Sequence, residues 1–148
     1  MTTRPTANIK MRVREGRREL FDIVRNRFVA LTPEEWVRQH AIHYLHYELG
    51  YPLELMQVEG TIMLNGMTRR CDIVVYDASV HPYIIVECKN ESVALSQKVL
   101  DQACRYNLVL QVPYLWLTNG MQQVCCHVDF EEKKVKMIQK LPEYHKKS

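Results

Sequence analysis

Two apolar, β-branched runs separated by a short turn constrain the fold of this chain more than any other feature. They occupy most of residues 69–89, which read RRCDIVVYDASVHPYIIVECK. Runs of this length and composition are typical of two neighbouring strands of a sheet. Asp72 lies near the start of the first run, Glu87 lies near the end of the second, and Lys89 follows it. Because charged side chains are seldom buried unless they are paired or bind a metal, these three residues are the first candidates for function.

The predicted hairpin places the two carboxylates opposite each other. A symmetric connection pairs Asp77 with Pro82. The same register then pairs Asp72 with Glu87, with Cβ atoms about 4.5–5.5 Å apart. Facing like charges destabilise a sheet and burial increases the cost, so a positive charge should compensate them. Mg²⁺ fits best, because it prefers oxygen ligands and commonly takes one or two carboxylates.

Side-chain alternation along the second strand brings Lys89 close to this pair. Lys89 is expected on the same face as Glu87, together with Tyr83 and Ile85. There its ammonium group would help to hold an attacking water and offset the charge that develops on a phosphate during metal-assisted hydrolysis. The residues alone leave an alternative open, in which a one-residue bulge turns one carboxylate outward and Lys89 is a salt-bridge partner.

The rest of the chain predicts an α/β (α+β) fold in a single domain that spans residues 1–148. Thr32, Pro33 and Glu35 form the start of a helix with a capping box. The predicted order is a hairpin within 9–24, a helix over 32–50, strands over 55–64, 71–77 and 83–89, a helix over 96–110, a strand over 113–120 and a closing hairpin within 122–140. Strands that meet first as a meander and later through a helical crossover predict a mixed sheet with helices packed on it.

Charge is distributed unevenly along the chain. Residues 1–27 and 133–148 each carry a net charge of +5, whereas residues 28–132 carry −7. Basic ends around an acidic centre suit a polyanion held at the rim of a metal site. Solubilising charge on flexible ends explains the same pattern, and charge alone favours this second explanation.

The sequence lacks the features of membrane-spanning proteins, secreted proteins and nucleotide-driven motors. The chain has no apolar run of about 18 residues, so no membrane span is predicted. The N-terminus lacks the apolar region of a secretory signal, and no GxxxxGK(S/T) motif predicts nucleotide-motor activity. The five cysteines form no CxxC pair, which favours reduced thiols in a cytoplasmic protein.

The spacing of the three charged residues resembles a known nuclease signature. Asp72, Glu87 and Lys89 form a D-x14-E-x-K pattern on two strands followed by a helix, as in PD-(D/E)xK nucleases. The helix adds QACRY, residues 102–106, which is similar to the QxxxY element of the RecB-like and type I restriction branches. LTPEEWVRQH, DIVVYD, VECK, DQACRYN and PYLWLTNG, in this order, resemble the N-terminal nuclease domain of type I restriction enzyme R subunits. The chain looks like the small stand-alone bacterial proteins that carry only this domain, and the resemblance covers roughly residues 20–130.

This resemblance implies a restriction-endonuclease-like fold and a metal-dependent deoxyribonuclease with Mg²⁺ or Mn²⁺ as cofactor. The implied metal ligands are Asp72, Glu87 and the backbone carbonyl of Cys88, with Glu35 as the candidate ligand from the first helix. Lys89 would be the catalytic lysine. Gln102 and Tyr106 would approach the nucleic acid or orient the lysine. Arg69 and Arg70 precede the first strand closely enough to contact phosphate, although exposed charge at a strand edge explains them equally well.

A second class of function stays open beside the enzyme. A nuclease fold of this kind can bind nucleic acid or act as a scaffold without cutting, and it can require an unknown protein partner. Intact Asp72, Glu87 and Lys89 weigh against a non-catalytic copy, because buried charges are costly to retain. The motor and specificity partners of a restriction complex are not expected in this chain, so a role in restriction is not implied.

Three further groups of residues are predicted to be structural. His40, His43 and His46 recur on one helix without an obvious fourth ligand for zinc, so we expect them on the helix surface. Cys71 and Cys88 should face each other across the hairpin as core side chains, with a disulfide as the alternative. The remaining candidates for the core are Trp36, Trp116, Cys125 and Cys126.

Overall fold

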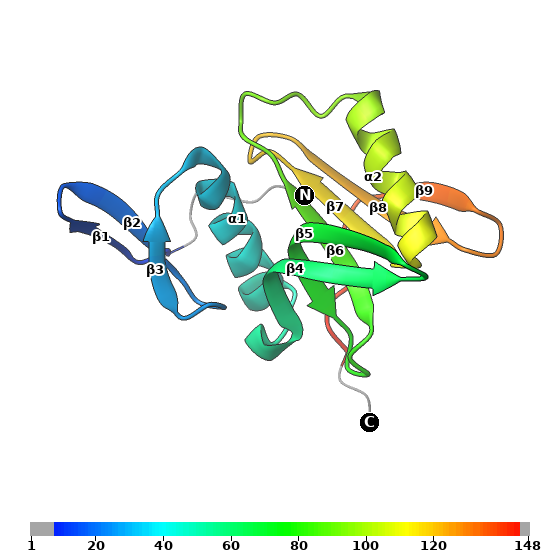
Figure 1. Cartoon of the computed structure of the whole chain (residues 1–148), viewed down its shortest axis with the longest axis horizontal. Coiled ribbons are helices and arrows are strands. Elements are labelled where there is room, and N and C mark those ends of the chain that lie inside the picture. Colours follow the sequence, from blue (N-terminus) through cyan, green and yellow to red (C-terminus); the bar gives the residue numbers. More distant parts are fainter. Residues whose placement is uncertain (1–7, 146–148) are drawn as a thin grey trace.

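The computed structural model describes residues 8–145, which form a small sheet, a large sheet and two long helices (Figure 1). In chain order the elements are β1 (Met11–Arg14), β2 (Arg17–Asp22), β3 (Arg27–Ala30), α1 (Pro33–His43), the π-helical turn η1 (Tyr44–Glu48), the 3-10 turn η2 (Leu53–Leu55), β4 (Met56–Leu64), β5 (Met67–Tyr76), β6 (Pro82–Cys88), α2 (Gln97–Leu110), β7 (Tyr114–Thr118), β8 (Gln123–Asp129) and β9 (Lys134–Ile138). No helix in this part of the chain is long and apolar enough to cross a membrane.

The large sheet has the strand order β4-β5-β6-β7-β8-β9. Its neighbouring strands are antiparallel except β6 and β7, which run parallel and are connected through α2. A parallel pair needs such a crossover, whereas antiparallel pairs close with short turns. α1 and α2 pack on opposite faces of the sheet, each over its own cluster of buried apolar side chains (Figure 1). The predicted α+β fold with a mixed central sheet is therefore confirmed.

The first helix begins as its sequence predicts, with Pro33 as the first residue and the hydroxyl of Thr32 accepting the N–H of Glu35 at 3.1 Å. Its last turn differs, because residues 44–48 form a π-helical turn. The expectation that the histidines lie on its surface is wrong for His40 and His43, which are buried. The reason is that α1 lies between β2 on one side and β6 on the other, so two of its sides are covered.

The N-terminal segment is a three-stranded sheet and not only a hairpin. β1 and β2 turn at Glu15 and Gly16, both with positive φ, as the sequence predicts. The strand β3 was not predicted, and the second predicted strand ends at Asp22. The Asp22 carboxylate accepts the N–H groups of Val24 and Arg25, both at 2.8 Å, and so forms the turn into β3. This sheet stands on the far side of α1 from the large sheet (Figure 1).

The register of β5 and β6 agrees with the prediction except next to their connecting turn. Ile73 pairs with Val86 and Val75 with Ile84, as predicted, but Tyr76 pairs with Pro82. The predicted pairing of Asp77 with Pro82 is therefore wrong. The Asp77 carboxylate accepts the N–H groups of Ser79 and His81 and tightens the turn. Tyr83 is the residue of β6 left without a partner at this shift. It packs with the cluster beneath α1, so the expectation that it shares a face with Ile85 is wrong.

A sharp twist in the β4–β5 hairpin lies at the level of Asp72. Cys71 belongs to the cluster beneath α2 and Ile73 to the cluster beneath α1, although residues two apart in a strand normally share a face. On the partner strand, Met56 and Ile62 are divided between the two clusters in the same way. Glu59 lies between them with a φ of 55°, in the left-handed region. The hairpin thus changes faces at this level without a shift in register, because Val58 pairs with Ile73 and Gly60 with Cys71.

This twist corrects the expectation for the two cysteines of the hairpin. Cys88 belongs to the cluster beneath α1, on the opposite side from Cys71, so they do not face each other. Both are buried free thiols, as expected of core side chains. Trp116 is fully buried, whereas Trp36 is half-buried and stacks on the ring of His40 at 4.3 Å.

Candidate active site

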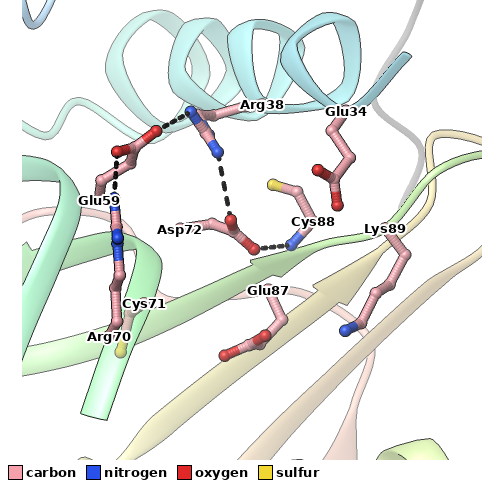
Figure 2. A pocket seen from close by; sticks show the side chains of 9 residues that line it. All are labelled: Glu34, Arg38, Glu59, Arg70, Cys71, Asp72, Glu87, Cys88 and Lys89. Atoms are coloured by element: carbon pink, nitrogen blue, oxygen red, sulfur yellow. Dashed lines mark hydrogen bonds and ion pairs between the residues drawn. The ribbon is translucent and has the colours of Figure 1, made fainter. Parts of the chain in front are cut away.

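A polar pocket of about 340 Å³ opens where the N-terminal half of α1 meets the middle of β5 and the end of β6 (Figure 2). It contains the three charged residues that the sequence analysis singled out, contributed by the twisted part of β5, the end of β6 and the residue after it. Its lining residues are Glu34, Arg38, Glu59, Arg70, Cys71, Asp72, Glu87, Cys88 and Lys89. Four of these are acidic and three are basic, so the pocket is a site of paired charges.

Asp72 closes the end of the β5–β6 ladder. One carboxylate oxygen accepts the backbone N–H of Cys88 at 2.7 Å, beyond the last main-chain pair of Ile73 and Val86. The other oxygen pairs with Arg38 at 3.3 Å. Figure 2 shows the Asp72 carboxylate between Arg38 of α1 and the backbone of Cys88 in β6. Asp72 is thus held by a main-chain donor and a cation from two different elements.

Glu87 is buried, and its side chain is directed away from that of Asp72 (Figure 2). It forms an ion pair with Arg69. Burial raises the pKa of Glu87 above its ordinary value, Arg69 and Lys89 act against the rise, and the nearby Asp72 adds to it. The printed pairing of the two strands ends at Ile73 and Val86, and the two side chains point apart, so the predicted facing of the two carboxylates is not observed (Figure 2). An arginine lies beside each of them instead.

Arg38 pairs with more than one carboxylate around the pocket, and its sequence context did not predict this role. It is 8% exposed and pairs with Glu35 at 3.0 Å, Glu59 at 3.2 Å and Asp72 at 3.3 Å. A signal was present, because Arg38 lies one turn after two glutamates and next to the buried Val37. Its partners, however, come from three different segments, and no periodic pattern in the sequence connects them.

The acidic residue of α1 that lines the pocket is Glu34, and Glu35 is not among the lining residues. The Glu35 carboxylate pairs with Arg25 and Arg38, and Arg25 also pairs with Asp22 at 2.7 Å. A continuous chain of ion pairs therefore runs from the end of β2 through α1 to the pocket. Its members in order are Asp22, Arg25, Glu35, Arg38 and Asp72.

Of the remaining predicted site residues, Arg70 and Lys89 line the pocket, whereas Arg69, Gln102 and Tyr106 do not. Gln102 is exposed on α2. The Tyr106 ring lies under the guanidinium of Arg69, with 4.0 Å between the Arg69 Cζ and the ring centroid, so Tyr106 is linked to Glu87 through Arg69. Arg70 is 73% exposed and pairs with Glu59 at 2.6 Å. Lys89 is anchored through its backbone N–H, which donates to Thr118 at 2.8 Å.

The acidic residues of the pocket are of the type that binds Mg²⁺ and not of the type that forms a structural zinc site. Within residues 8–145 no three His, Cys, Asp or Glu side chains gather in a way that holds a metal, which is what structural zinc sites require. Asp72 and Glu87 supply two carboxylates, and Mg²⁺ commonly takes one or two and completes its shell with water. The residue types match this ion, but the two side chains point apart and each is paired with an arginine, so a shared ion requires the carboxylates to reorient.

Comparison with known proteins shows what the chain as a whole is similar to. No curated protein sequence matches the chain. The fragment structure of an HsdR subunit proposed for a type I restriction enzyme of Vibrio vulnificus YJ016 aligns with 69% of the chain at 18% identity and a TM-score of 0.46. The alignment covers 22% of that chain, so the present chain corresponds to about a fifth of it.

A second solved structure shares the fold over nearly the whole chain. It is a proposed nuclease belonging to DUF820 from Anabaena variabilis ATCC 29413, aligned over 95% of this chain and 85% of its own at 10% identity, with a TM-score of 0.52. The restriction-endonuclease-like expectation for the fold is therefore confirmed. The sequence model of the type I restriction enzyme R protein N terminus matches residues 33–142, about three quarters of the chain. The chain belongs to this family of type I restriction enzyme R protein N-terminal domains.

Proposed function

We propose that this chain is a metal-dependent nuclease domain that hydrolyses phosphodiester bonds in DNA. The observation that carries the proposal is that Asp72, Glu87 and Lys89 line one pocket beside the paired strands β5 and β6. Family membership supports DNA as the substrate, and the Anabaena protein of the same fold is described as a nuclease. We also propose a cytoplasmic location, which the free thiols support.

Asp72 and Glu87 would hold Mg²⁺ or Mn²⁺, with the Cys88 carbonyl as a further ligand. Bound metal supplies polarisation of the phosphate and a lower pKa of the attacking water. Lys89 would donate to a phosphoryl oxygen or to that water and offset the negative charge of the transition state. The Cys88 N–H fixes the Asp72 carboxylate, so this ligand is oriented before substrate binds. Glu34, or Glu35 as the sequence analysis proposes, would add an acidic group from α1.

The basic residues that line the pocket, Arg38, Arg70 and Lys89, are the candidate donors to phosphate. Arg69 lies beside the pocket, where it pairs with Glu87. Arg70, Gln102 and Tyr106 remain proposed contacts to the nucleic acid at the rim.

One observation favours a second candidate function. Arg38 and Arg69 neutralise Asp72 and Glu87 without a cation, as in a structural ion-pair network. The alternative is therefore a module that keeps the nuclease fold and binds nucleic acid or a partner protein without cutting.

Metal binding separates the two functions. Mn²⁺ at about 100 times its dissociation constant should stabilise the wild type by about 2.7 kcal/mol, because it binds only the folded state. Asp72→Asn should abolish this gain, since the amide keeps an acceptor for the Cys88 N–H but loses the charge that binds the cation. The measurement is thermal unfolding with and without Mn²⁺.

The matched control is Glu131→Gln, which removes an exposed carboxylate in the turn between β8 and β9. It should keep the full Mn²⁺ stabilisation. A wild type that gains nothing from Mn²⁺, or an Asp72→Asn variant that gains as much as the wild type, would support the non-catalytic module.

A further inference from the structure

The small N-terminal sheet has one face turned toward the body of the protein and one turned to solvent. Leu20 and Asp22 lie on the first face and are fully buried. Asp22 accepts a hydrogen bond from Gln39 of α1 at 2.9 Å, so this face is attached to the helix. Because side chains alternate along a strand, the residues between them point the other way.

The solvent face, which we call the basic face, is defined by the register of the three strands. Arg12 pairs with Glu19, Arg14 with Arg17, and Phe21 with Phe28. Lys10 continues this side of β1, because its carbonyl accepts the Phe21 N–H at 2.8 Å. The four basic residues of this face, Lys10, Arg12, Arg14 and Arg17, are all exposed, and Glu19 is its one acidic residue.

The pair of Arg14 and Arg17 is unfavourable for folding. Like charges directly opposite each other destabilise a sheet, and neither guanidinium forms an ion pair within residues 8–145. An anionic partner that binds these two adjacent guanidinium groups at the exposed end of the hairpin would therefore relieve their repulsion.

The aromatic rings of the basic face favour duplex DNA over single-stranded nucleic acid as its partner. The Arg12 Cζ lies 3.9 Å from the Phe28 ring centroid, and the Lys10 ammonium lies 5.9 Å from that of Phe21. Rings covered by cations are not free to stack on the unpaired bases that single-stranded nucleic acid offers. Arg12 also forms an ion pair with Glu19 at 2.6 Å, so the net positive charge of the basic face comes from Lys10, Arg14 and Arg17. This charge suits the phosphates of a duplex.

We propose that the basic face is a second DNA-binding surface that contacts the phosphate backbone of duplex DNA away from the pocket. This inference rests on the proposed function for the choice of DNA. The chain of ion pairs from Asp22 to Asp72 attaches the sheet to the pocket. A duplex bound on the basic face is therefore held at a fixed position relative to Asp72, and the contact supplies affinity without sequence specificity.

The test is binding of a short fluorescein-labelled DNA duplex, measured by anisotropy in EDTA over a series of salt concentrations. The double variant R14Q/R17Q should bind the duplex roughly tenfold or more weakly than the wild type at low salt, because two phosphate contacts are lost. The slope of log affinity against log salt should become shallower by about 2. Its Tm should be unchanged or higher, because the facing charges are removed.

The control is K133Q/K136Q, which removes two exposed lysines at β9 and its preceding turn, at the opposite end of the molecule (Figure 1). This variant has the same net charge as R14Q/R17Q and should bind like the wild type. Equal weakening in both variants, or no weakening in R14Q/R17Q, would overturn the inference. The inference would also be overturned if R14Q/R17Q lost as much affinity for single-stranded DNA of the same sequence as it lost for the duplex. Since no divalent ion or cleavage is involved, failure of the proposed nuclease function is detected separately, by the Mn²⁺ experiments.

Discussion

Replacing Lys89 with alanine is expected to reduce DNA cleavage by at least about a hundredfold, the usual effect of removing one donor that stabilises transition-state charge. Lys89 lines the pocket with Asp72 and Glu87, and no other lysine is among the lining residues. Its backbone position is fixed by the hydrogen bond to Thr118, so loss of the side chain should leave the strand in place. The measurement is the initial rate of cleavage of labelled DNA in Mn²⁺.

Two controls make the Lys89 result specific. Lys98→Ala removes an exposed lysine on α2 and should leave the rate unchanged. Stabilisation of Lys89→Ala by Mn²⁺ should persist, because the proposed metal ligands are carboxylates. Cleavage by Lys89→Ala at the wild-type rate would show that this lysine has no role in the reaction.

Replacing Asp22 with alanine is expected to lower the free energy of unfolding by about 3 kcal/mol, since removal of one partner from a buried pair leaves the other uncompensated. The Asp22 carboxylate is fully buried and accepts from the Arg25 side chain, from Gln39 and from two backbone N–H groups. For a chain of this size the loss corresponds to a decrease in Tm of roughly 6–12 °C. Thermal unfolding measures it directly.

Asp129 offers a matched control for Asp22. It also accepts two backbone N–H groups, from Glu131 and Glu132, but in an exposed turn. Asp129→Ala should cost less than about 1 kcal/mol, near the net value of an ordinary hydrogen bond. Equal stabilities of Asp22→Ala and the wild type would contradict the anchoring role of the ion-pair chain.

The Asp22 carboxylate makes the stability of the folded protein sensitive to acid. Burial alone would raise the pKa of Asp22, but hydrogen bonds from the Arg25 backbone, Gln39 and the Arg25 guanidinium lower it below the ordinary value. Since the pKa is lower in the folded state, the stabilisation is present above the ordinary pKa, about 4, and is lost as pH falls through the folded value. The Tm of the wild type should therefore decrease below about pH 4 more steeply than that of Asp22→Asn.

The parts of the fold that the sequence predicts are those with local signals. The capping box at Thr32, the turn at Gly16 and the apolar runs of β5, β6 and β7 each depend on residues close together in the chain. The register that brings Asp72 and Glu87 to the same end of the β5–β6 pairing was also predicted, because the irregularity at Tyr83 is confined to the turn. The divergence of their two side chains was not predicted.

What the sequence could not predict depends on contacts between distant residues. The change of faces at Asp72 requires a left-handed Glu59 on the neighbouring strand, a conformation that no local preference of glutamate indicates. Arg38 pairs with residues from three segments, and burial of His40 follows from the position of the N-terminal sheet over α1. These features arise from tertiary packing, which leaves no periodic pattern.

Cleavage of labelled single- and double-stranded DNA in Mn²⁺, with the wild type and Asp72→Ala compared side by side, tests the central claim most directly. We predict that the wild type cuts DNA and that Asp72→Ala does not, which would place the catalytic centre in the pocket between α1, β5 and β6. Equal cutting by both proteins would contradict this centre. No cutting by either would contradict the claim that the chain is itself a nuclease and would favour the non-catalytic module.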